Sequence, residues 1–363
     1  MRLLLAGGGT GGHLFPAVAL AQLLLKQDDN SVVQFVGTER GLEQRLLPKL
    51  GLPLATVDMV GVVGRGWRGK LELLPKLFKS LGQAKKILGH FGPDLVIGVG
   101  GYASVPVLLM AKMTGIPYLI HEQNAIPGLS NRLLGKGAKL ICLSFTDSDS
   151  GFDRNKTLVT GNPLRQELDN VSTEIPQRGK LLIFGGSRGA RAINQVVIKM
   201  LPLLHDWEQK PELLHQTGDD DYLQVQQGYR DAGFDPQQVV PFIDDMAAAY
   251  TEASLVICRA GATTLSELTN CGRAAILIPF PHAAGDHQTA NAKALKDAGA
   301  AILLPQDELT PERLATLVKS LLDDRQTLQN MAKQGRQLSY SGAAERILNE
   351  CRRLLGTPLV EGI

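Results

Sequence analysis

Each half of this chain of 363 residues opens with an apolar run that ends in glycines. The segment 3–8 reads Leu-Leu-Leu-Ala-Gly-Gly, and the segment 181–186 reads Leu-Leu-Ile-Phe-Gly-Gly. A second pair follows, because 94–103 and 254–263 each run from an apolar strand through small residues into a helical pattern. Strands that alternate with helices in this way indicate a parallel sheet covered on both faces. The sequence therefore predicts an α/β chain of two similar, doubly wound, Rossmann-like domains.

The boundary between the two domains is expected near the segment Gly161-Asn162-Pro163, because a polar, mixed stretch follows it. This gives a first domain over 1–163 and a second over 164–340. An amphipathic helix within 341–363 has no strand after it and can pack on either domain, including back on the first. Ligands of open parallel sheets bind beyond the carboxyl ends of the strands. We therefore expect the site in a central cleft that the two domains face.

Charge and cysteine content exclude several classes of protein. The 38 basic and 36 acidic residues give a net charge of +2, unlike the strongly basic balance of a general nucleic-acid binder. The four cysteines are far apart and form no Cys-x-x-Cys pair, so buried, reduced thiols of a cytosolic protein fit better than disulfides or zinc. The uncharged stretches 3–25 and 95–111 are interrupted by glycines, and we predict neither a signal peptide nor a transmembrane helix.

The first glycine loop, residues 7–12, satisfies the pattern Gly-x-Gly-x-x-Gly that is typical of dinucleotide binding. The acidic residue that this interpretation needs at the end of the second strand is poorly met by Glu39, which lies too far along the chain. His13 follows the loop directly and is a candidate general base, because imidazole titrates near neutrality. The alternative for His13 is a structural histidine that hydrogen-bonds to the backbone at a helix start.

The second half carries two small-residue helix starts. The loop 185–190 exposes backbone N–H groups where the helix dipole favours an anion, and Ser187 adds a hydroxyl, so phosphate binding is the functional interpretation. The alternative is a tight turn that needs glycine for its backbone alone. The segment 261–267 follows another strand, and Glu267 could accept both hydroxyls of a ribose. The alternative for Glu267 is an ordinary acid that stabilises the helix dipole.

Polar side chains also follow two other predicted strands. The segments 121–124 (His-Glu-Gln-Asn) and 286–291 (Asp-His-Gln-Thr-Ala-Asn) combine histidine with amides, which favours ligand contact over an ordinary surface loop. Arg165 follows the interdomain segment and is placed to neutralise a phosphate. The acidic groups 147–149 and 219–221 could hold Mg²⁺, but neither follows a convincing strand, so a solvated loop is the better interpretation of both.

A basic, amphipathic segment spans 65–89 and contains Trp67 and Phe78 among seven lysines and arginines. Such a segment can lie on an anionic membrane surface. It can equally be a helix that covers the sheet and turns a solvated basic face outward.

The chain contains six motifs in this order: 8–13, 121–124, 161–163, 185–190, 242–246 and 286–291. Together they resemble the MurG family of bacterial glycosyltransferases over nearly the whole chain. The resemblance implies a GT-B fold and transfer of N-acetylglucosamine from UDP-N-acetylglucosamine to the undecaprenyl-pyrophosphoryl-MurNAc-pentapeptide lipid, for peptidoglycan synthesis, cell shape and division.

The resemblance also implies a division of labour between the domains. The second domain would hold most of the donor, with backbone groups of Ile243 on uracil and Glu267 on the ribose, and the first would bind the lipid acceptor. His13 is the candidate base of an inverting transfer to the 4-hydroxyl of the acceptor sugar, with no metal and no cofactor. The stretch 282–285 is the least family-like at the expected site. The donor contacts implied are Thr10, Gly11, Gly12, Asn124, Arg165, Ser187, Ile243, Ala262, Thr263, Thr264, Leu265, Ser266, Glu267 and Gln288.

The same resemblance places the protein on the cytoplasmic face of the plasma membrane as a peripheral protein, because the acceptor lipid is anchored there. Three other functions remain open from the residues alone. They are a nicotinamide-dependent oxidoreductase, another UDP-sugar enzyme of the same fold such as an epimerase or glycolipid transferase, and a UDP-sugar-binding protein without catalysis.

Overall fold

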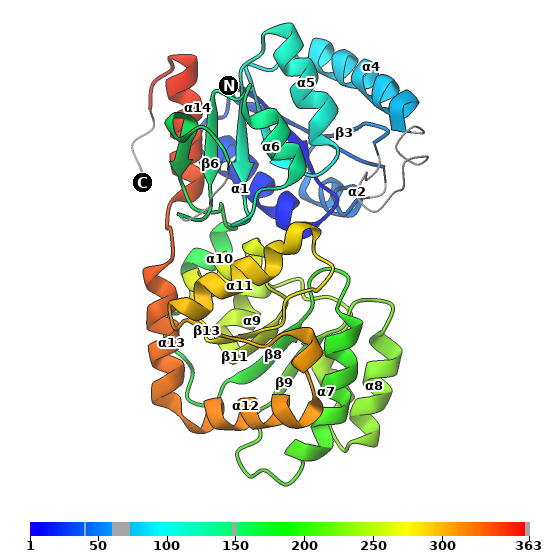
Figure 1. Ribbon diagram of the computed structural model, residues 1–363, viewed down its shortest axis with the longest axis vertical. Coiled ribbons are helices and arrows are strands. Elements are labelled where there is room, and N and C mark those ends of the chain that lie inside the picture. Colours follow the sequence, from blue (N-terminus) through cyan, green and yellow to red (C-terminus); the bar gives the residue numbers. More distant parts are fainter. Residues whose placement is uncertain (40, 60–72, 147–150, 360–363) are drawn as a thin grey trace. The chain divides into compact units, whose positions relative to one another are not determined.

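The computed structural model describes residues 1–39, 41–59, 73–146 and 151–359, with the side chains of 73 and 74 left out. The chain forms two compact units. Unit 1 comprises Met1–Arg165 together with Tyr340–Ile363, and unit 2 comprises Gln166–Ser339 (Figure 1). Arg165 therefore belongs to unit 1, two residues beyond the domain end that the sequence suggests.

Unit 1 is built on a seven-stranded sheet with the order β3-β2-β1-β4-β5-β6-β7, in which every neighbouring pair is parallel. Its strands are β1 (Arg2–Gly7), β2 (Val32–Gly37), β3 (Leu54–Thr56), β4 (Leu95–Gly100), β5 (Tyr118–Glu122), β6 (Leu140–Leu143) and β7 (Thr157–Val159). Its helices are α1 (Gly11–Gln27), α2 (Glu43–Leu46), α4 (Leu73–Phe91), α5 (Ser104–Thr114), α6 (Leu129–Gly135) and α14 (Ala343–Leu355), with short 3₁₀ turns at Pro48–Leu50 and Arg154–Lys156.

Side chains of alternate residues in the central strand β1 enter two different cores. Leu3 and Leu5 pack with α1 and α14, whereas Leu4 and Ala6 pack with α4 and α5 on the opposite face. A strand that is apolar at every position and buried on both faces is expected in a parallel sheet. The continuous apolar runs that predicted the fold thus reflect a sheet covered by helices on both sides.

Unit 2 repeats this plan with a six-stranded parallel sheet of order β10-β9-β8-β11-β12-β13. Its strands are β8 (Lys180–Phe184), β9 (Leu213–Gln216), β10 (Val239–Val240), β11 (Ala253–Cys258), β12 (Ala275–Leu277) and β13 (Ala301–Leu303). Its helices are α7 (Arg191–Leu204), α8 (Tyr222–Asp231), α9 (Met246–Glu252), α10 (Ala262–Cys271), α11 (His287–Asp297), α12 (Pro311–Asp323) and α13 (Arg325–Gln337). Short 3₁₀ turns lie at Gln166–Asn170, Pro236–Gln238, Ala284–Asp286 and Gln306–Glu308.

The first six strands of unit 1 and the six strands of unit 2 follow the same spatial order, so the predicted duplication and the doubly wound fold are confirmed. In each sheet the order reverses beside the first strand, between β1 and β4 and between β8 and β11. Open α/β sheets bind ligands beyond the carboxyl ends of their strands at such a reversal. The loops after these four strands are therefore the places to look for a site.

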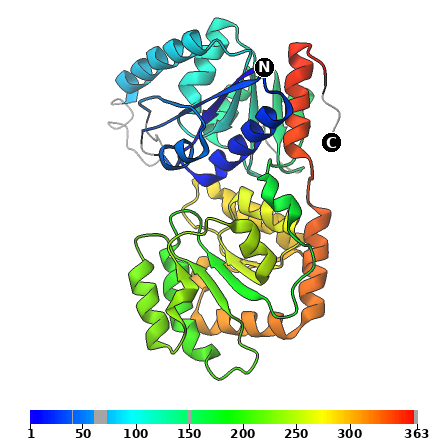
Figure 2. The same cartoon turned by 180° about the vertical axis from the view of Figure 1, so that it is seen from behind.

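The C-terminal helix α14 packs on unit 1, where Ile347, Leu348 and Cys351 are fully buried against residues of α1 (Figure 2). All four cysteines are free and buried. Burial raises the pKa of the Cys351 thiol to about 12, which keeps that thiol protonated. Within the described residues, no helix is both long enough and apolar enough to cross a bilayer.

Candidate functional site

The first glycine loop turns sharply at the carboxyl end of β1. Gly7 has a φ of +146°, and a β-carbon there would collide with the carbonyl oxygen of Gly100 in the neighbouring strand β4. Glycine is therefore required at position 7 for the close approach of two backbones. Thr10 then caps α1 with extended backbone, and its carbonyl accepts the N–H groups of His13 and Leu14.

A buried carboxylate from α2 holds this loop from within unit 1. Glu43 is 0% exposed, and its Oε2 accepts the backbone N–H of Gly9 at 2.9 Å. Its Oε1 accepts both the backbone N–H and the hydroxyl of Thr38, at 2.9 and 3.0 Å. The carboxylate thus ties the loop after β1 to the loop after β2.

The acidic side chain that lies beside the end of β2 is therefore Glu43. Glu39, the residue considered from the sequence, is exposed. In a dinucleotide-binding loop the backbone N–H groups face a pyrophosphate, and the acid after the second strand binds a ribose hydroxyl. Here the N–H of Gly9 is already bonded to the acid. This pairing weighs against a nicotinamide dinucleotide in the first loop.

His13, in the first turn of α1, lies beside the end of β5. Its Nδ1 is 3.2 Å from the side-chain oxygen of Gln123. The amide nitrogen of Gln123 donates to the carbonyl of Val99 at 3.0 Å and contacts Nδ1 of His121 at 3.1 Å. His121 is completely buried, and burial lowers its pKa to about 4, so that it is neutral near pH 7. The interpretation of His13 as a histidine bonded only to the helix-start backbone is therefore incomplete, because its ring engages the polar cluster after β5.

Glu122, buried at the end of β5, organises the loop that carries Asn124. One carboxylate oxygen accepts the backbone N–H of Asn124 at 2.9 Å and its side-chain amide at 3.2 Å. The other accepts the N–H of Gly128 and the side-chain amide of Asn131, at 3.0 and 2.8 Å. Within the segment 121–124, Glu122 and Gln123 are thus buried supports, and Asn124 is the half-buried member at the loop surface.

Arg165 at the end of unit 1 lies against α1. Its guanidinium carbon is 4.8 Å from the ring centroid of Phe15, a distance at which a cation and an aromatic face attract. Unit 1 therefore brings Arg165 next to the helix that begins with Gly11, Gly12 and His13. Arg165 and the start of α1 are far apart in the sequence, and the contact with Phe15 brings them together.

In unit 2, the glycine loop 185–190 leads from β8 into α7, whose N-cap is Ala190. Ser187 and Gly186 are exposed at its tip. Gly189 has a φ of +73°, and a β-carbon there would collide with the backbone carbonyl of Thr217, in the loop after β9. The glycine at 189 is thus required by the backbone, as the tight-turn interpretation states, while the exposed tip leaves the helix start accessible to an anion.

A buried polar cluster fixes that loop to its neighbour. Asn194 donates to the carbonyl of Thr217 at 3.0 Å and to Asp221 at 2.9 Å, and its side-chain oxygen is 3.1 Å from Nε2 of His215. Arg191 pairs with Asp221 at 3.1 Å. Asp221 is buried, so the interpretation of 219–221 as a solvated loop is wrong for Asp221 and holds for the exposed Asp219 and Asp220. The other acidic group, 147–149, lies outside the described residues.

The second helix start of unit 2 is α10, whose N-cap is Gly261 in extended backbone. The first turn of α10 contains no acid, so Glu267 is not the first-turn acid considered as an alternative. Glu267 is only 6% exposed, and its Oε2 accepts the hydroxyl of Tyr250 at 2.9 Å. A buried carboxylate oriented by a buried tyrosine is suited to hold hydroxyl groups.

The segment that leads into α11, the helix that carries Gln288, contains two consecutive residues with positive φ. Asp286 is the one non-glycine residue with positive φ among the described residues, at +55°, and Gly285 before it has a φ of +63°. Gln288 accepts the backbone N–H of Phe280 at 2.9 Å through its side-chain oxygen, which fixes the start of α11. The unusual stretch 282–285 thus forms a tight connection into α11. Ile243 is half-buried in the loop between β10 and α9.

The sheet topology decides which predicted residues share an edge. In unit 1, Thr10, Gly11, Gly12, His13, Asn124 and Arg165 follow the carboxyl ends of strands. In unit 2, the segments that contain Ser187, Ile243, Ala262–Glu267 and Gln288 also follow strand ends, from β8, β10, β11 and β12. Two residues that sequence reasoning did not single out support these loops: Glu43 beneath the first loop and Arg259 after β11. Arg259 is buried and donates to the carbonyls of Ile278 and Pro279 at 3.1 and 2.9 Å.

The basic segment is described only from residue 73 onward, so Trp67 and the other residues of 65–72 lie outside the described residues. Ala84 and Leu88 of α4 are buried in the core, which confirms that α4 covers the sheet. Lys76 and Phe78 are exposed, Phe78 at 72%. Lys79 pairs with Asp58 at 2.8 Å.

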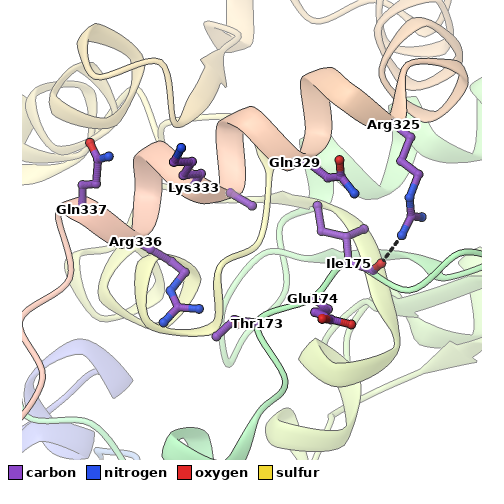
Figure 3. A pocket seen from close by; sticks show the side chains of 9 residues that line it. Thr173, Glu174, Ile175, Arg325, Gln329, Lys333, Arg336 and Gln337 are labelled. Atoms are coloured by element: carbon purple, nitrogen blue, oxygen red, sulfur yellow. Dashed lines mark hydrogen bonds between the residues drawn. The ribbon is translucent and has the colours of Figure 1, made fainter.

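A cavity of about 700 Å³ lies elsewhere in unit 2, along α13 and the segment 173–175 (Figure 3). The guanidinium of Arg325 donates to the carbonyls of Ile175 and Pro176, at 2.7 and 3.0 Å. None of the predicted site residues lines this cavity.

Within the described residues, no group of three or more His, Cys, Asp or Glu side chains is arranged to hold a metal ion.

Comparisons with known proteins agree with this geometry. The glycosyltransferase family 28 N-terminal domain matches residues 3–142, and the family 28 C-terminal domain matches residues 180–347. A protein of Syntrophotalea carbinolica, a UDP-N-acetylglucosamine–N-acetylmuramyl-(pentapeptide) pyrophosphoryl-undecaprenol N-acetylglucosamine transferase, is 55% identical over 98% of this chain and 99% of its own length. A Myxococcus xanthus protein of the same name is 46% identical over 98% of this chain and 93% of its own.

Solved structures point the same way. The crystal structure of MurG from Acinetobacter baumannii has a TM-score of 0.75 at 36% identity and covers 97% of this chain and 99% of its own. A UDP-N-acetylglucosamine 2-epimerase structure from Listeria monocytogenes has a TM-score of 0.68 at 14% identity, covers 100% of this chain and 98% of its own, and shares the fold alone.

Proposed function

The chain belongs to glycosyltransferase family 28, and from that membership we propose the reaction, the residues and the membrane surface described below. It is a hexosyltransferase of GT-B fold that moves N-acetylglucosamine from UDP-N-acetylglucosamine to the undecaprenyl-pyrophosphoryl-MurNAc-pentapeptide lipid, for peptidoglycan synthesis. The observation that carries this conclusion is the 55% identity over 98% of the chain to a transferase of that name.

The donor is proposed to bind unit 2 at the carboxyl edge of its sheet. The start of α7, with Ser187, supplies hydrogen-bond donors and a positive dipole end for the diphosphate. The start of α10, residues Ala262–Ser266, supplies a second positive dipole end. Glu267 on the same helix accepts hydroxyls of the ribose. Backbone groups of Ile243 are proposed to read the uracil, and Gln288 to contact the sugar. Family resemblance also assigns donor contacts to Thr10, Gly11, Gly12, Asn124 and Arg165 of unit 1.

The chemistry is proposed to be a single inverting displacement. The 4-hydroxyl oxygen of the acceptor sugar forms a bond to C1 of N-acetylglucosamine, while the bond from C1 to the phosphate oxygen breaks and UDP leaves with the electron pair. His13 takes the proton of the attacking hydroxyl. Helix starts, Ser187 and Arg165 stabilise the charge that develops on the departing diphosphate, in place of a metal ion.

Donor binding provides a direct test against the oxidoreductase alternative. We expect UDP to raise the melting temperature of the protein and NAD to leave it unchanged, since a ligand at 100 times its Kd adds about 2.7 kcal/mol to stability. Glu267→Gln keeps an oxygen for the Tyr250 hydroxyl but loses the charge, and should weaken UDP binding about 10-fold. Glu208→Ala, an exposed acid of unit 2, is the matched control and should bind as the wild type does. Protection by NAD without protection by UDP would support the oxidoreductase instead.

Peripheral attachment to the cytoplasmic face of the plasma membrane is proposed through α4. Lys76 and the 72% exposed ring of Phe78 lie on the solvent side of a helix whose other face is buried in unit 1. An exposed cation and an exposed aromatic ring on one helix are suited to an anionic lipid surface. The attachment would bring unit 1 to the membrane in which the acceptor lipid is anchored.

Vesicle binding tests this attachment. The double variant Lys76→Ala, Phe78→Ala should bind anionic vesicles more weakly than the wild type, by about fivefold from the lysine alone and further from loss of the ring. The double variant Lys199→Ala, Leu203→Ala removes a similar exposed pair from α7 of unit 2 and should change nothing. Equal binding of wild type and α4 variant would remove the proposal.

A further inference from the structure

The hydrogen bonds around Gln123 determine which nitrogen of the His13 ring carries the proton. The carbonyl oxygen of Val99 accepts only hydrogen bonds, so the group of Gln123 that lies 3.0 Å from it must be the amide NH₂. This fixes the orientation of the amide within a residue that is 1% exposed. The side-chain oxygen of Gln123 therefore faces Nδ1 of His13, at 3.2 Å.

His121 completes the same chain of donors and acceptors. The amide NH₂ of Gln123 lies 3.1 Å from Nδ1 of His121 and can only donate, so this nitrogen carries a lone pair. Nε2 of His121 then carries the proton and donates to the carbonyl of Gly161 at 3.3 Å, with the hydroxyl of Ser144 at the same distance. Burial keeps His121 neutral, with a pKa of about 4, so the direction of the chain does not reverse near pH 7.

We infer that Gln123 is the positioning residue that holds the His13 imidazole with Nδ1 protonated and Nε2 carrying the lone pair. An amide oxygen accepts and does not donate, so Nδ1 of His13 must be the donor in this pair. A neutral imidazole has one proton on its two nitrogens, and Nε2 is then the basic atom. The chain runs from the backbone of Gly161 through His121 and Gln123 to His13.

For the proposed function, this arrangement selects one atom as the proton acceptor. The assignment of Nε2 stands on the geometry, and only its use in catalysis rests on the proposed function. Partners that orient metal-ligating histidines typically contribute about 10- to 100-fold, and we expect an effect of the same order for Gln123 on His13. Gln123 does this without touching the substrate, which separates its role from those of Asn124 and Arg165.

The tautomer can be measured directly by ¹⁵N NMR of the unliganded, full-length protein near pH 7, with His13→Gln used to assign the His13 signals. The inference predicts a protonated Nδ1 and an unprotonated Nε2 in the wild type. A wild-type His13 with its proton on Nε2 would overturn it, with no variant needed.

Variants of Gln123 separate positioning from structure. Gln123→Met removes the acceptor and should give a mixture of both His13 tautomers, with kcat lowered about 10- to 100-fold and the KM for the donor little changed. Gln123→Glu loses the amide donor to the carbonyl of Val99 but keeps an oxygen that accepts from the His13 ring, so it should keep Nδ1 of His13 protonated. Gln34→Met makes the same replacement on β2 of unit 1 and is the control.

An unchanged His13 tautomer in a folded Gln123→Met protein would contradict the inference, because it would make Gln123 a merely structural residue. A shifted tautomer with unchanged kcat would support the inference and would instead remove the general-base role of His13. The two failures are therefore distinguishable.

Discussion

Replacement of His13 by alanine is expected to lower kcat by about 10²- to 10⁴-fold, the usual contribution of a general base. The acceptor hydroxyl is a poor nucleophile while it keeps its proton, and His13 is the side chain proposed to receive that proton as the new bond to C1 forms. The interaction is made in the transition state, so kcat and kcat/KM should fall together. Steady-state rates with both substrates saturating measure the effect.

The control for this variant is His205→Ala. His205 is exposed in unit 2 and pairs with Asp206 at 2.9 Å, so its loss should leave turnover unchanged. Near-normal turnover of His13→Ala at saturating donor and acceptor would show that another group receives the proton. UDP binding of the variant, measured by thermal protection, would show whether the donor site is still intact.

The fold could be predicted because its signals are local. The apolar strands β1 and β8 end in glycines that the backbone needs, and the equivalent strands β4 and β11 repeat the pattern. Two such strands per half define where each sheet reverses its order, and the remaining strands add on either side. The loops that follow these strands are consequently visible in the sequence as well.

The partners within the site could not be predicted, because they depend on contacts between distant segments. His13 and Gln123 are 110 residues apart, and Gly9 and Glu43 are 34 apart. A sequence shows that Glu43 is acidic but not that it is fully buried against a glycine loop. It likewise shows the amide of Gln123 without the carbonyl of Val99 that fixes its orientation.

The errors have the same physical origin. The sequence assigns Asp221 to a solvated loop because no convincing strand precedes 219–221, yet β9 ends at Gln216, and Arg191 and Asn194 bind Asp221 inside unit 2. Glu39 was considered because it follows β2 closely in the sequence, whereas the chain returns through α2 to place Glu43 there. In both cases a tertiary contact overrides a local pattern.

The second large prediction concerns the transfer reaction, in which the sugar moves to the lipid without a metal ion. Leaving-group charge is proposed to be stabilised by the starts of α7 and α10 with Ser187 and Arg165. The two helix starts are fixed in the fold: Gly189 packs on the backbone of Thr217, and Arg259 holds the strand end before α10. Preorganised donors of this kind need no added ion to act. Full activity is therefore expected when divalent metals are removed.

The most direct measurement is to incubate the protein with UDP-N-acetylglucosamine labelled in the sugar and with the undecaprenyl-pyrophosphoryl-MurNAc-pentapeptide lipid, in the presence of EDTA. We expect label to appear in the lipid fraction, at one sugar per acceptor, and the rate to equal that without EDTA. Label that stays in the nucleotide sugar, or that is found in an epimer of it, would contradict the transferase function. Activity lost in EDTA and restored by Mg²⁺ would contradict the metal-independent stabilisation of the leaving group.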